Sequence, residues 1–174
     1  MADITCLRMF DASLGAPKGE ACPEGATFLN DVAAGGDGTI FFTDSGLKAG
    51  PEGFAPSGTD AVYRLTVADG RIEAVAKDTT LGAPNGIAAG SDGITVVTFT
   101  SGEAYRVTAE GKRHPMMPPS KRQLDGVVVL APGGTMTNAL EGIEAPADIG
   151  YDASRNRVLV PLFNANRAVL HSLS

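Results

Sequence analysis

Tryptophan is absent from the sequence, and histidine and cysteine occur only twice each. Thiolate and imidazole are the ligands that zinc prefers, and neither His114 nor His171 lies at a usual ligand spacing from a cysteine. Hydrophobic runs are short, and none approaches the ~18–20 residues of a membrane-spanning helix. Basic residues are outnumbered, with 14 Lys and Arg against 20 Asp and Glu, and they form no basic stripe. We therefore expect neither a nucleic acid nor a membrane as a partner of this chain.

The first residues, from Met1 to Cys6, carry neither the basic segment nor the apolar segment of a signal peptide. We expect a cytoplasmic protein, with the periplasm as the alternative if the natural N-terminus is missing. Cys6 and Cys22 have 15 residues between them, and closing such a loop would stabilise the fold by about 3 kcal/mol. Two cysteines in a chain of this size are more often free and buried, so we favour free thiols and leave the pairing open.

Glycine and proline are abundant, with 22 and 11 residues in a chain of 174. The apolar share of 43% and the charged share of 20% are those of a globular protein. Short stretches rich in Val, Ile, Phe, Tyr and Thr alternate between apolar and polar residues, and Asp-Gly turns separate them. No stretch of ten or more residues carries a helical apolar stripe. The sequence therefore predicts an all-β protein of antiparallel strands.

Four segments of the chain follow one pattern, in which small polar residues precede a β-branched residue. A turn follows each segment, and candidate strands come after it at 39–43, 94–98 and 157–161. Four antiparallel strands that recur about every 40–45 residues are typical of the blades of a β-propeller. An insertion at 47–57 interrupts the first repeat, and we expect it to be a long loop. The four segments are 28–32, 83–87, 123–127 and 146–149.

The spacing of the repeats predicts one propeller-like domain that is incomplete or reduced in blade number. With Asn30, Asn85, Asp125 and Ala147 as equivalents, the steps along the chain are 55, 40 and 22 residues. The chain then holds about four blade equivalents. A closed four-bladed ring, an open arc that dimerises and a longer natural chain are the alternatives left open. The expected parts are the outer strands of a partial blade at 1–25, blades at 26–80 and 81–122, a partial blade at 123–142 and a last blade at 143–174.

Polar residues stand at the start of each innermost strand, so in a propeller they converge on one mouth of the central channel. Carboxylate and amide oxygens suit hard cations such as Ca²⁺ and Mg²⁺. A bound cation would polarise a lactone carbonyl and acidify a coordinated water, whose proton Asp125, Asp31 or Asp148 could accept. No Gly-x-Ser-x-Gly motif supports a serine nucleophile. Asn and Asp at such positions also form turns, which is the alternative for each of them.

Several of these motifs resemble the gluconolactonase/regucalcin (senescence marker protein) superfamily of β-propellers, and the resemblance covers most of residues 26–174. It implies a six-bladed propeller with one divalent cation in the channel and, in most characterised members, hydrolysis of lactones or related esters. The motifs that carry it are Leu29-Asn-Asp-Val-Ala33, Gly36-Asp-Gly38, Thr43-Asp-Ser45, Pro84-Asn-Gly-Ile-Ala88, Ser91-Asp-Gly93, Leu124-Asp-Gly-Val127 and Ala145-Pro-Ala-Asp-Ile-Gly-Tyr-Asp152.

The resemblance assigns Asn85 and Asp125 as ligands of the cation, and it places Asn30, with Asp31 beside it, near the bound substrate. The family's third ligand, a Glu of the first blade, has no counterpart in this sequence. The resemblance therefore implies weakened metal binding, a substitute acid or a ligand supplied by a partner subunit.

We expect a divalent-metal-dependent hydrolase of the lactonase type that acts on a small lactone or ester. Asp125 is the expected catalytic residue and, with Asn85, a metal ligand, while Asn30, Asp31 and Asp148 are expected against the substrate. Ca²⁺ is the expected cation, with Mg²⁺, Mn²⁺ and Zn²⁺ as alternatives. A non-catalytic propeller that binds a metabolite or a protein through the same mouth is the first alternative. The second is an inactive remnant that completes its ring as a homodimer.

Overall fold

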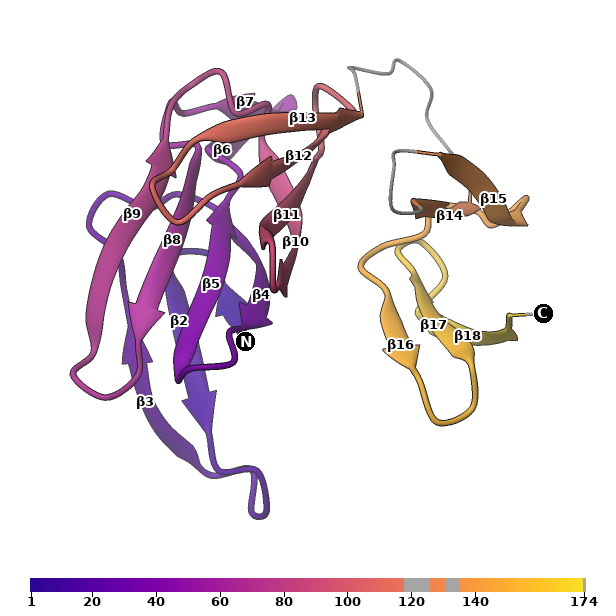
Figure 1. Ribbon diagram of the computed structural model, residues 1–174, viewed down its shortest axis with the longest axis horizontal. Coiled ribbons are helices and arrows are strands. Elements are labelled where there is room, and N and C mark those ends of the chain that lie inside the picture. Colours follow the sequence, from indigo (N-terminus) through magenta and orange to yellow (C-terminus); the bar gives the residue numbers. More distant parts are fainter. Residues whose placement is uncertain (118–125, 131–134, 174) are drawn as a thin grey trace. The chain divides into compact units, whose positions relative to one another are not determined.

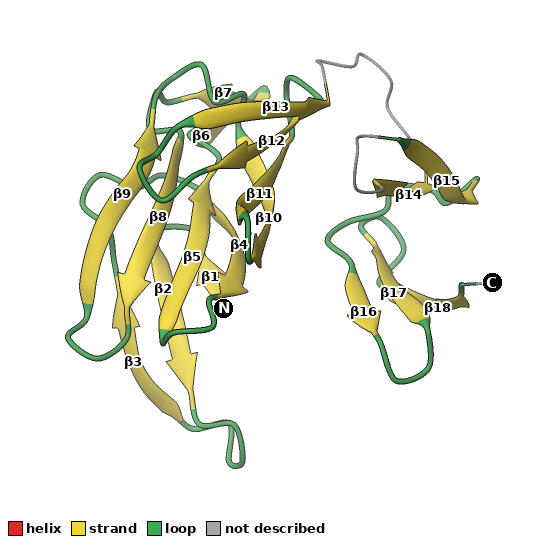
Figure 2. Ribbon diagram, in the orientation of Figure 1, coloured by secondary structure: helices red, strands yellow, loops and turns green. Residues whose placement is uncertain are grey.

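The computed structural model describes residues 1–117, 126–130 and 135–173, and it divides into unit 1, Met1–Lys121, and unit 2, Arg122–Ser174. Within these ranges the chain forms strands and loops but no helix (Figure 2), so this part of the chain offers no helix that could cross a bilayer. The strands pair in antiparallel sheets, two of which have four strands. The all-β prediction is therefore confirmed.

The first four-stranded sheet of unit 1 has the order β4-β5-β8-β9 (Figure 1). Because β5 pairs with β8, Phe42 lies beside Tyr63, and the two buried rings stack at 5.2 Å between centroids. Leu29 and Leu65 complete the same apolar cluster. The strands are β4 (Leu29–Ala34), β5 (Thr39–Asp44), β8 (Ala61–Thr66) and β9 (Arg71–Lys77).

The second four-stranded sheet of unit 1 repeats this design in the order β10-β11-β12-β13. Its core holds Val96, Tyr105 and Val107, and the Tyr105 hydroxyl donates to the carbonyl of Leu81 at 3.1 Å. Burial raises the pKa of the Tyr105 hydroxyl, so the ring stays neutral and able to donate this bond. The strands are β10 (Pro84–Gly90), β11 (Gly93–Thr98), β12 (Ala104–Val107) and β13 (Arg113–Met117).

The insertion between β5 and β8 is a two-stranded hairpin and not the predicted long loop. β6 (Leu47–Gly50) pairs antiparallel with β7 (Gly53–Pro56), and the turn falls at residues 51–52. Phe54 on this hairpin meets the ring of Phe28 edge-on, at 5.0 Å between centroids. The prediction was wrong because two glycines and two prolines lower the strand propensity of the segment, although its register permits pairing.

The N-terminal residues form a three-stranded sheet of β1 (Ala2–Asp3), β2 (Cys6–Phe10) and β3 (Pro17–Ala21). Cys6 and Cys22 form a disulfide, so the expectation of free thiols was wrong. The disulfide forms because of the hairpin register. Leu7 pairs with Ala21, so the next pair of positions in the register places Cys6 opposite Cys22. Spacing alone did not reveal this register.

Unit 2 consists of a two-stranded sheet and a three-stranded sheet (Figure 1). The predicted strand at 157–161 is confirmed as β17, which pairs with β16 and β18 on its two sides. Val127, Val158 and Val160 are among the buried residues of its apolar core. The strands are β14 (Gly126–Leu130), β15 (Met136–Glu141), β16 (Gly150–Asp152), β17 (Arg157–Leu162) and β18 (Arg167–Ser172).

Candidate site at the start of the inner strands

The same backbone hydrogen bond marks the start of the repeat in three places. In each, an amide just after the second strand donates to a carbonyl just before the first strand or its equivalent. The predicted equivalence of Asn30, Asn85 and Ala147 is thereby confirmed, because each lies two residues after the accepting carbonyl. The bonds are Ser45 to Phe28 at 2.9 Å, Phe99 to Ala83 at 2.9 Å and Phe163 to Ala145 at 3.0 Å.

Both inner strands of unit 1 carry an irregularity at the candidate site. The pairing of β4 with β5 shifts register between Leu29 and Val32, and the pairing of β10 with β11 shifts between Pro84 and Ile87. The residues in between, 30–31 and 85–86, therefore lie outside the regular ladder. A bulge of this kind leaves backbone groups unpaired and redirects side chains, and bulges are common next to functional sites.

Hydroxyl groups on and just after β5 bind two backbone carbonyls of β10, one within its bulge and one just before it. Thr43 Oγ1 donates to the carbonyl of Asn85, and Ser45 Oγ donates to the carbonyl of Pro84, both at 2.6 Å. Each hydroxyl also accepts a bond from the inner strand of its own sheet, Thr43 from the amide of Asp31 at 3.1 Å and Ser45 from the side chain of Asn30 at 3.2 Å. Thr43 and Ser45 thus link β4 to β10.

Asp31 makes a further link between the two inner strands. Its Oδ2 accepts from the backbone amide of Ile87 at 2.8 Å, and its Oδ1 accepts from the amide of Val32 at 2.7 Å. An ionised carboxylate has about four lone-pair positions, so two remain for another group. Asp31 is half-buried at this position, which leaves part of its carboxylate accessible.

Two buried carboxylates support this end of unit 1. Asp44 is fully buried, and its side chain accepts from the amides of Thr27, Phe28 and Gly46 at 2.9–3.0 Å. Asp60 is 7% exposed and accepts from the amide of Ala83 at 2.9 Å. Burial disfavours the charged form and raises the pKa of Asp60, against the opposite effect of the hydrogen bond.

The two asparagines occupy equivalent positions but differ in their partners. Asn30 donates its amide to Ser45 Oγ, which leaves its side-chain oxygen without a hydrogen bond to the described residues. The Asn85 side chain makes no hydrogen bond within the described parts of the chain, although it is half-buried. An amide oxygen in this situation is a candidate ligand for a cation or a substrate.

The remaining predicted site residues lie elsewhere. Asp125 falls outside the described residues. Asp148 is exposed in unit 2, and its Oδ1 accepts from the amide of Ile149 at 2.9 Å. Asp31 makes the same bond to the residue that follows it, so the two acids share one local geometry at equivalent repeat positions. Within unit 1, the structure brings together Asn30, Asp31 and Asn85.

Sequence reasoning assigned no role to the residues that hold these three in place. Thr43, Asp44 and Ser45 were noted as a motif, and Asp60 was not singled out. All three motif residues are fully buried and polar. Three consecutive polar residues at the end of an apolar strand are a detectable signal, because burial of such groups requires hydrogen-bond partners.

Solved structures of six-bladed β-propellers share this fold. A chain in the crystal structure of a nidogen/laminin complex aligns with a TM-score of 0.56 and 14% identity, over 97% of this chain and 54% of that one. A streptogramin B lyase aligns with a TM-score of 0.53 and 15% identity, over 83% of this chain and 54% of that one. The chain is a partial β-propeller. It spans about half the length of these structures, and no protein-family model and no curated protein sequence matches it.

Proposed function

We propose that the protein is a divalent-metal-dependent hydrolase of the lactonase type, as the resemblance to the gluconolactonase/regucalcin superfamily implies. The observation that carries the proposal is the pair Asn30 and Asn85. They stand at equivalent bulges of two inner strands that hydroxyl and carboxylate bonds join, and each has a side-chain oxygen without a partner among the described residues. The free Asn85 oxygen fits a hard cation, with Ca²⁺ first and Mg²⁺, Mn²⁺ or Zn²⁺ as alternatives, and the free Asn30 oxygen fits a substrate bound beside it.

Each predicted residue keeps a defined role in this proposal. Asn85 and Asp125 would hold the cation, and Asp125 would also accept the proton of the attacking water. Asn30 and Asp148 contact the lactone or ester. Asp31 contacts it through the lone pairs that its bonds to the backbone leave free. When bound, the cation would polarise the carbonyl and acidify the water.

The fold neither requires nor opposes this activity, because one matched structure is a streptogramin B lyase and the other is a chain of a nidogen/laminin complex. Folds host many functions, so the argument rests on the residues at the inner strands. The fit to a cation has a structural basis, since the Asn85 amide is half-buried without a hydrogen bond to any described residue. Such a group is stabilised when a ligand binds it.

Thermal unfolding with each of the four cations tests the metal site. A cation at about one hundred times its dissociation constant should stabilise the wild type by roughly 2.7 kcal/mol. Asn85→Ala and Asp125→Ala should each remove most of this stabilisation. Asn164→Ala is the matched control, because Asn164 is an exposed asparagine in the turn after β17. Unfolding that no cation shifts in the wild type would contradict the proposal.

A panel of lactones, scored by metal-dependent release of acid, tests the reaction itself. Hydrolysis adds one water to the mass of the substrate, whereas a lyase opens a ring by elimination and leaves the mass unchanged. Mass spectrometry of the products therefore separates the two reactions. Ring opening without a mass change would replace hydrolysis by elimination, and binding without turnover would favour the non-catalytic alternative.

We propose a cytoplasmic location for the protein. We also propose that a second copy of the chain binds as a partner and completes the propeller ring. Light scattering tests this directly, because the chain has a mass of 17.8 kDa and a homodimer has twice that mass. A monomer that binds the cation and turns over lactones would show that the second copy is not required.

A further inference from the structure

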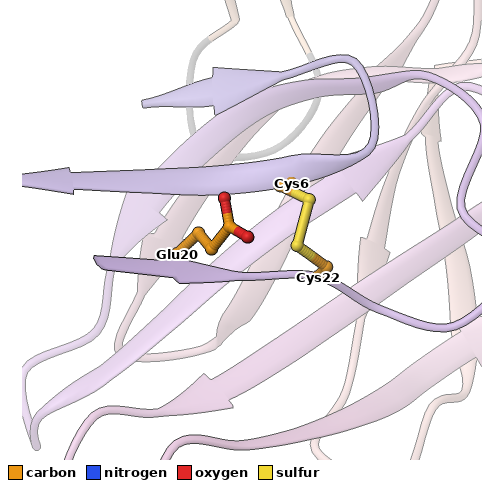
Figure 3. Close-up of side chains that lie close together, drawn as sticks. All are labelled: Cys6, Glu20 and Cys22. Carbon is orange, nitrogen blue, oxygen red and sulfur yellow. A yellow bond between two sulfur atoms is a disulfide. The ribbon is translucent and has the colours of Figure 1, made fainter.

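The N-terminal sheet brings two sulfur atoms and one carboxylate together. Cys6 lies on β2, Cys22 follows β3, and the Glu20 side chain lies beside their disulfide (Figure 3). One ligand atom from each of the three residues lies within 4.8 Å of the others. Among the described His, Cys, Asp and Glu residues, this is the group of three or more that could hold a metal ion.

The register of the hairpin explains why these groups meet. Arg8 pairs with Glu20 and Leu7 with Ala21, so the cysteines face each other one position further along. Side chains two residues apart on a strand share a face, which places Glu20 next to Cys22. Leu7 points to the other face and is 3% exposed in the apolar core, so the sulfur atoms lie on the outer, solvent-accessible face of the sheet.

We propose that reduction of the Cys6–Cys22 disulfide turns this face into a site for a thiophilic divalent cation of the Zn²⁺ class. The two thiolates and the Glu20 carboxylate would supply three ligands, and water would supply the fourth of a tetrahedral site. Thiolates select Zn²⁺ over Ca²⁺ and Mg²⁺, so this site differs in chemistry from the proposed oxygen site at the inner strands.

The redox step needs a dithiol reductant. The dithiol loses two electrons and two protons and becomes a disulfide, and the Cys6–Cys22 bond breaks to give two thiols. The cation then displaces both thiol protons into solvent, so metal binding strengthens as the pH rises. The 15 residues between the cysteines stay closed as a loop, because coordination of both sulfur atoms replaces the covalent bond.

Arg8 competes with the cation for the Glu20 carboxylate. Its guanidinium pairs with both Glu20 and Asp3, and the bond to Asp3 is 2.9 Å long. Glu20 must leave Arg8 in order to bind a cation, while Asp3 continues to hold the guanidinium. Both ion pairs are exposed, so breaking one of them has a low cost. The pairing with Arg8 also keeps the Glu20 side chain on the face of the sulfur atoms before any metal arrives.

Titration with Co²⁺ and Zn²⁺ tests the proposal on the whole 174-residue chain in its oxidised and reduced forms. A phosphine reduces the disulfide, takes up oxygen from water to become a phosphine oxide, and is then removed without air. Reduced wild type should bind one Co²⁺ with thiolate-to-cobalt absorption in the near ultraviolet, and Zn²⁺ should displace it. Oxidised wild type should show no such band. A cation at the inner strands would bind both forms alike and give no thiolate absorption.

Two variants test the ligand set. Glu20→Gln should weaken Zn²⁺ binding by the reduced protein by at least about tenfold, because it removes an anionic ligand. Glu24→Gln is the control, since Glu24 is exposed nearby but outside the cluster, and it should leave binding unchanged. The proposal is overturned if the reduced chain unfolds, if it binds without thiolate absorption, or if Glu20→Gln binds as tightly as Glu24→Gln.

Discussion

Unit 1 and unit 2 share the backbone hydrogen bond that marks the start of the repeat. The side chains beside this bond are polar in unit 1 and apolar in unit 2. In unit 1 the end of β5 and the residue after it are Thr43, Asp44 and Ser45, all fully buried. The equivalent stretch of unit 2 is 161–163, where the sequence has proline, leucine and phenylalanine. The buried polar side chains among the described residues, which include Asp60 as well, all lie in unit 1.

This difference separates two roles of the repeat. The backbone bond from Phe163 to Ala145 forms without any polar side chain, so the polar residues are not needed to start the inner strand. In unit 1, Thr43 and Ser45 bind backbone carbonyls of a neighbouring inner strand, within its bulge and just before it. The apolar residues of unit 2 support a single sheet, whereas the polar residues of unit 1 also join two sheets at the candidate site.

The largest expected effect is that of Asp44→Ala. The substitution leaves the amides of Thr27, Phe28 and Gly46 buried without their acceptor. We expect a loss of about 3–5 kcal/mol in the free energy of unfolding of unit 1. Urea unfolding gives the magnitude, and hydrogen exchange measured by peptide locates the loss. Asp92→Ala is the control, because Asp92 is exposed and should cost about 0.5 kcal/mol or less. Equal effects of the two variants would contradict the role of Asp44.

Reduction of the disulfide comes next in size and also acts on one unit. Opening the loop between Cys6 and Cys22 should lower the free energy of unfolding of unit 1 by about 3 kcal/mol, measured with a metal chelator present. Hydrogen exchange in unit 2 should not change. Faster exchange in both units would show that they unfold together.

Thr43→Val should cost about 1–3 kcal/mol, because it leaves the carbonyl of Asn85 and the amide of Asp31 without their partner. The shape should be tolerated, since valine differs from threonine only by a methyl group in place of the hydroxyl. Thr66→Val is the control, because Thr66 is half-buried on β8 and makes no side-chain hydrogen bond within the described residues. Equal unfolding curves for the two variants would show that the hydroxyl link is dispensable.

The sequence could predict the strands and their repeat because these depend on local patterns. The alternation in 39–43 and 94–98 and the turns between strands are visible in single stretches. The equivalence of Asn30, Asn85 and Ala147 followed from the same local signals. The strands, the turns and the repeat positions can therefore be predicted without knowing which strands pack against each other.

The links between strands could not be predicted, since they depend on register and burial. The Cys6–Cys22 bond and the pairing of β6 with β7 require a hairpin register that composition does not fix. The bond from Asp31 to Ile87 joins residues 56 positions apart. The candidate site was therefore predicted by residue type, while the groups that position it became visible only in the structure.

The smallest expected effects are opposite responses of the two units to pH. Burial raises the pKa of Asp60 in unit 1, so the folded state holds this proton to a higher pH than the unfolded chain. The stability of unit 1 should therefore fall as the pH rises from the unfolded pKa through the raised folded pKa. In unit 2, hydrogen bonds from Ser154, Arg157 and Arg155 lower the pKa of Asp152. Its contribution is fully present above the unfolded pKa and is lost as the pH falls through the folded pKa.

Other carboxylates titrate in the same range, so each acid is isolated by the difference between wild type and a single variant. Asp60→Asn keeps an oxygen that can accept from Ala83, and it should stabilise unit 1 relative to wild type at neutral pH but not in acid. Asp152→Asn should destabilise unit 2 at neutral pH but not in acid. Urea unfolding across the pH range gives both differences. Curves of the same sign would mean that burial does not dominate at Asp60, and the contrast between the buried acid of unit 1 and the ion-paired acid of unit 2 would then be lost.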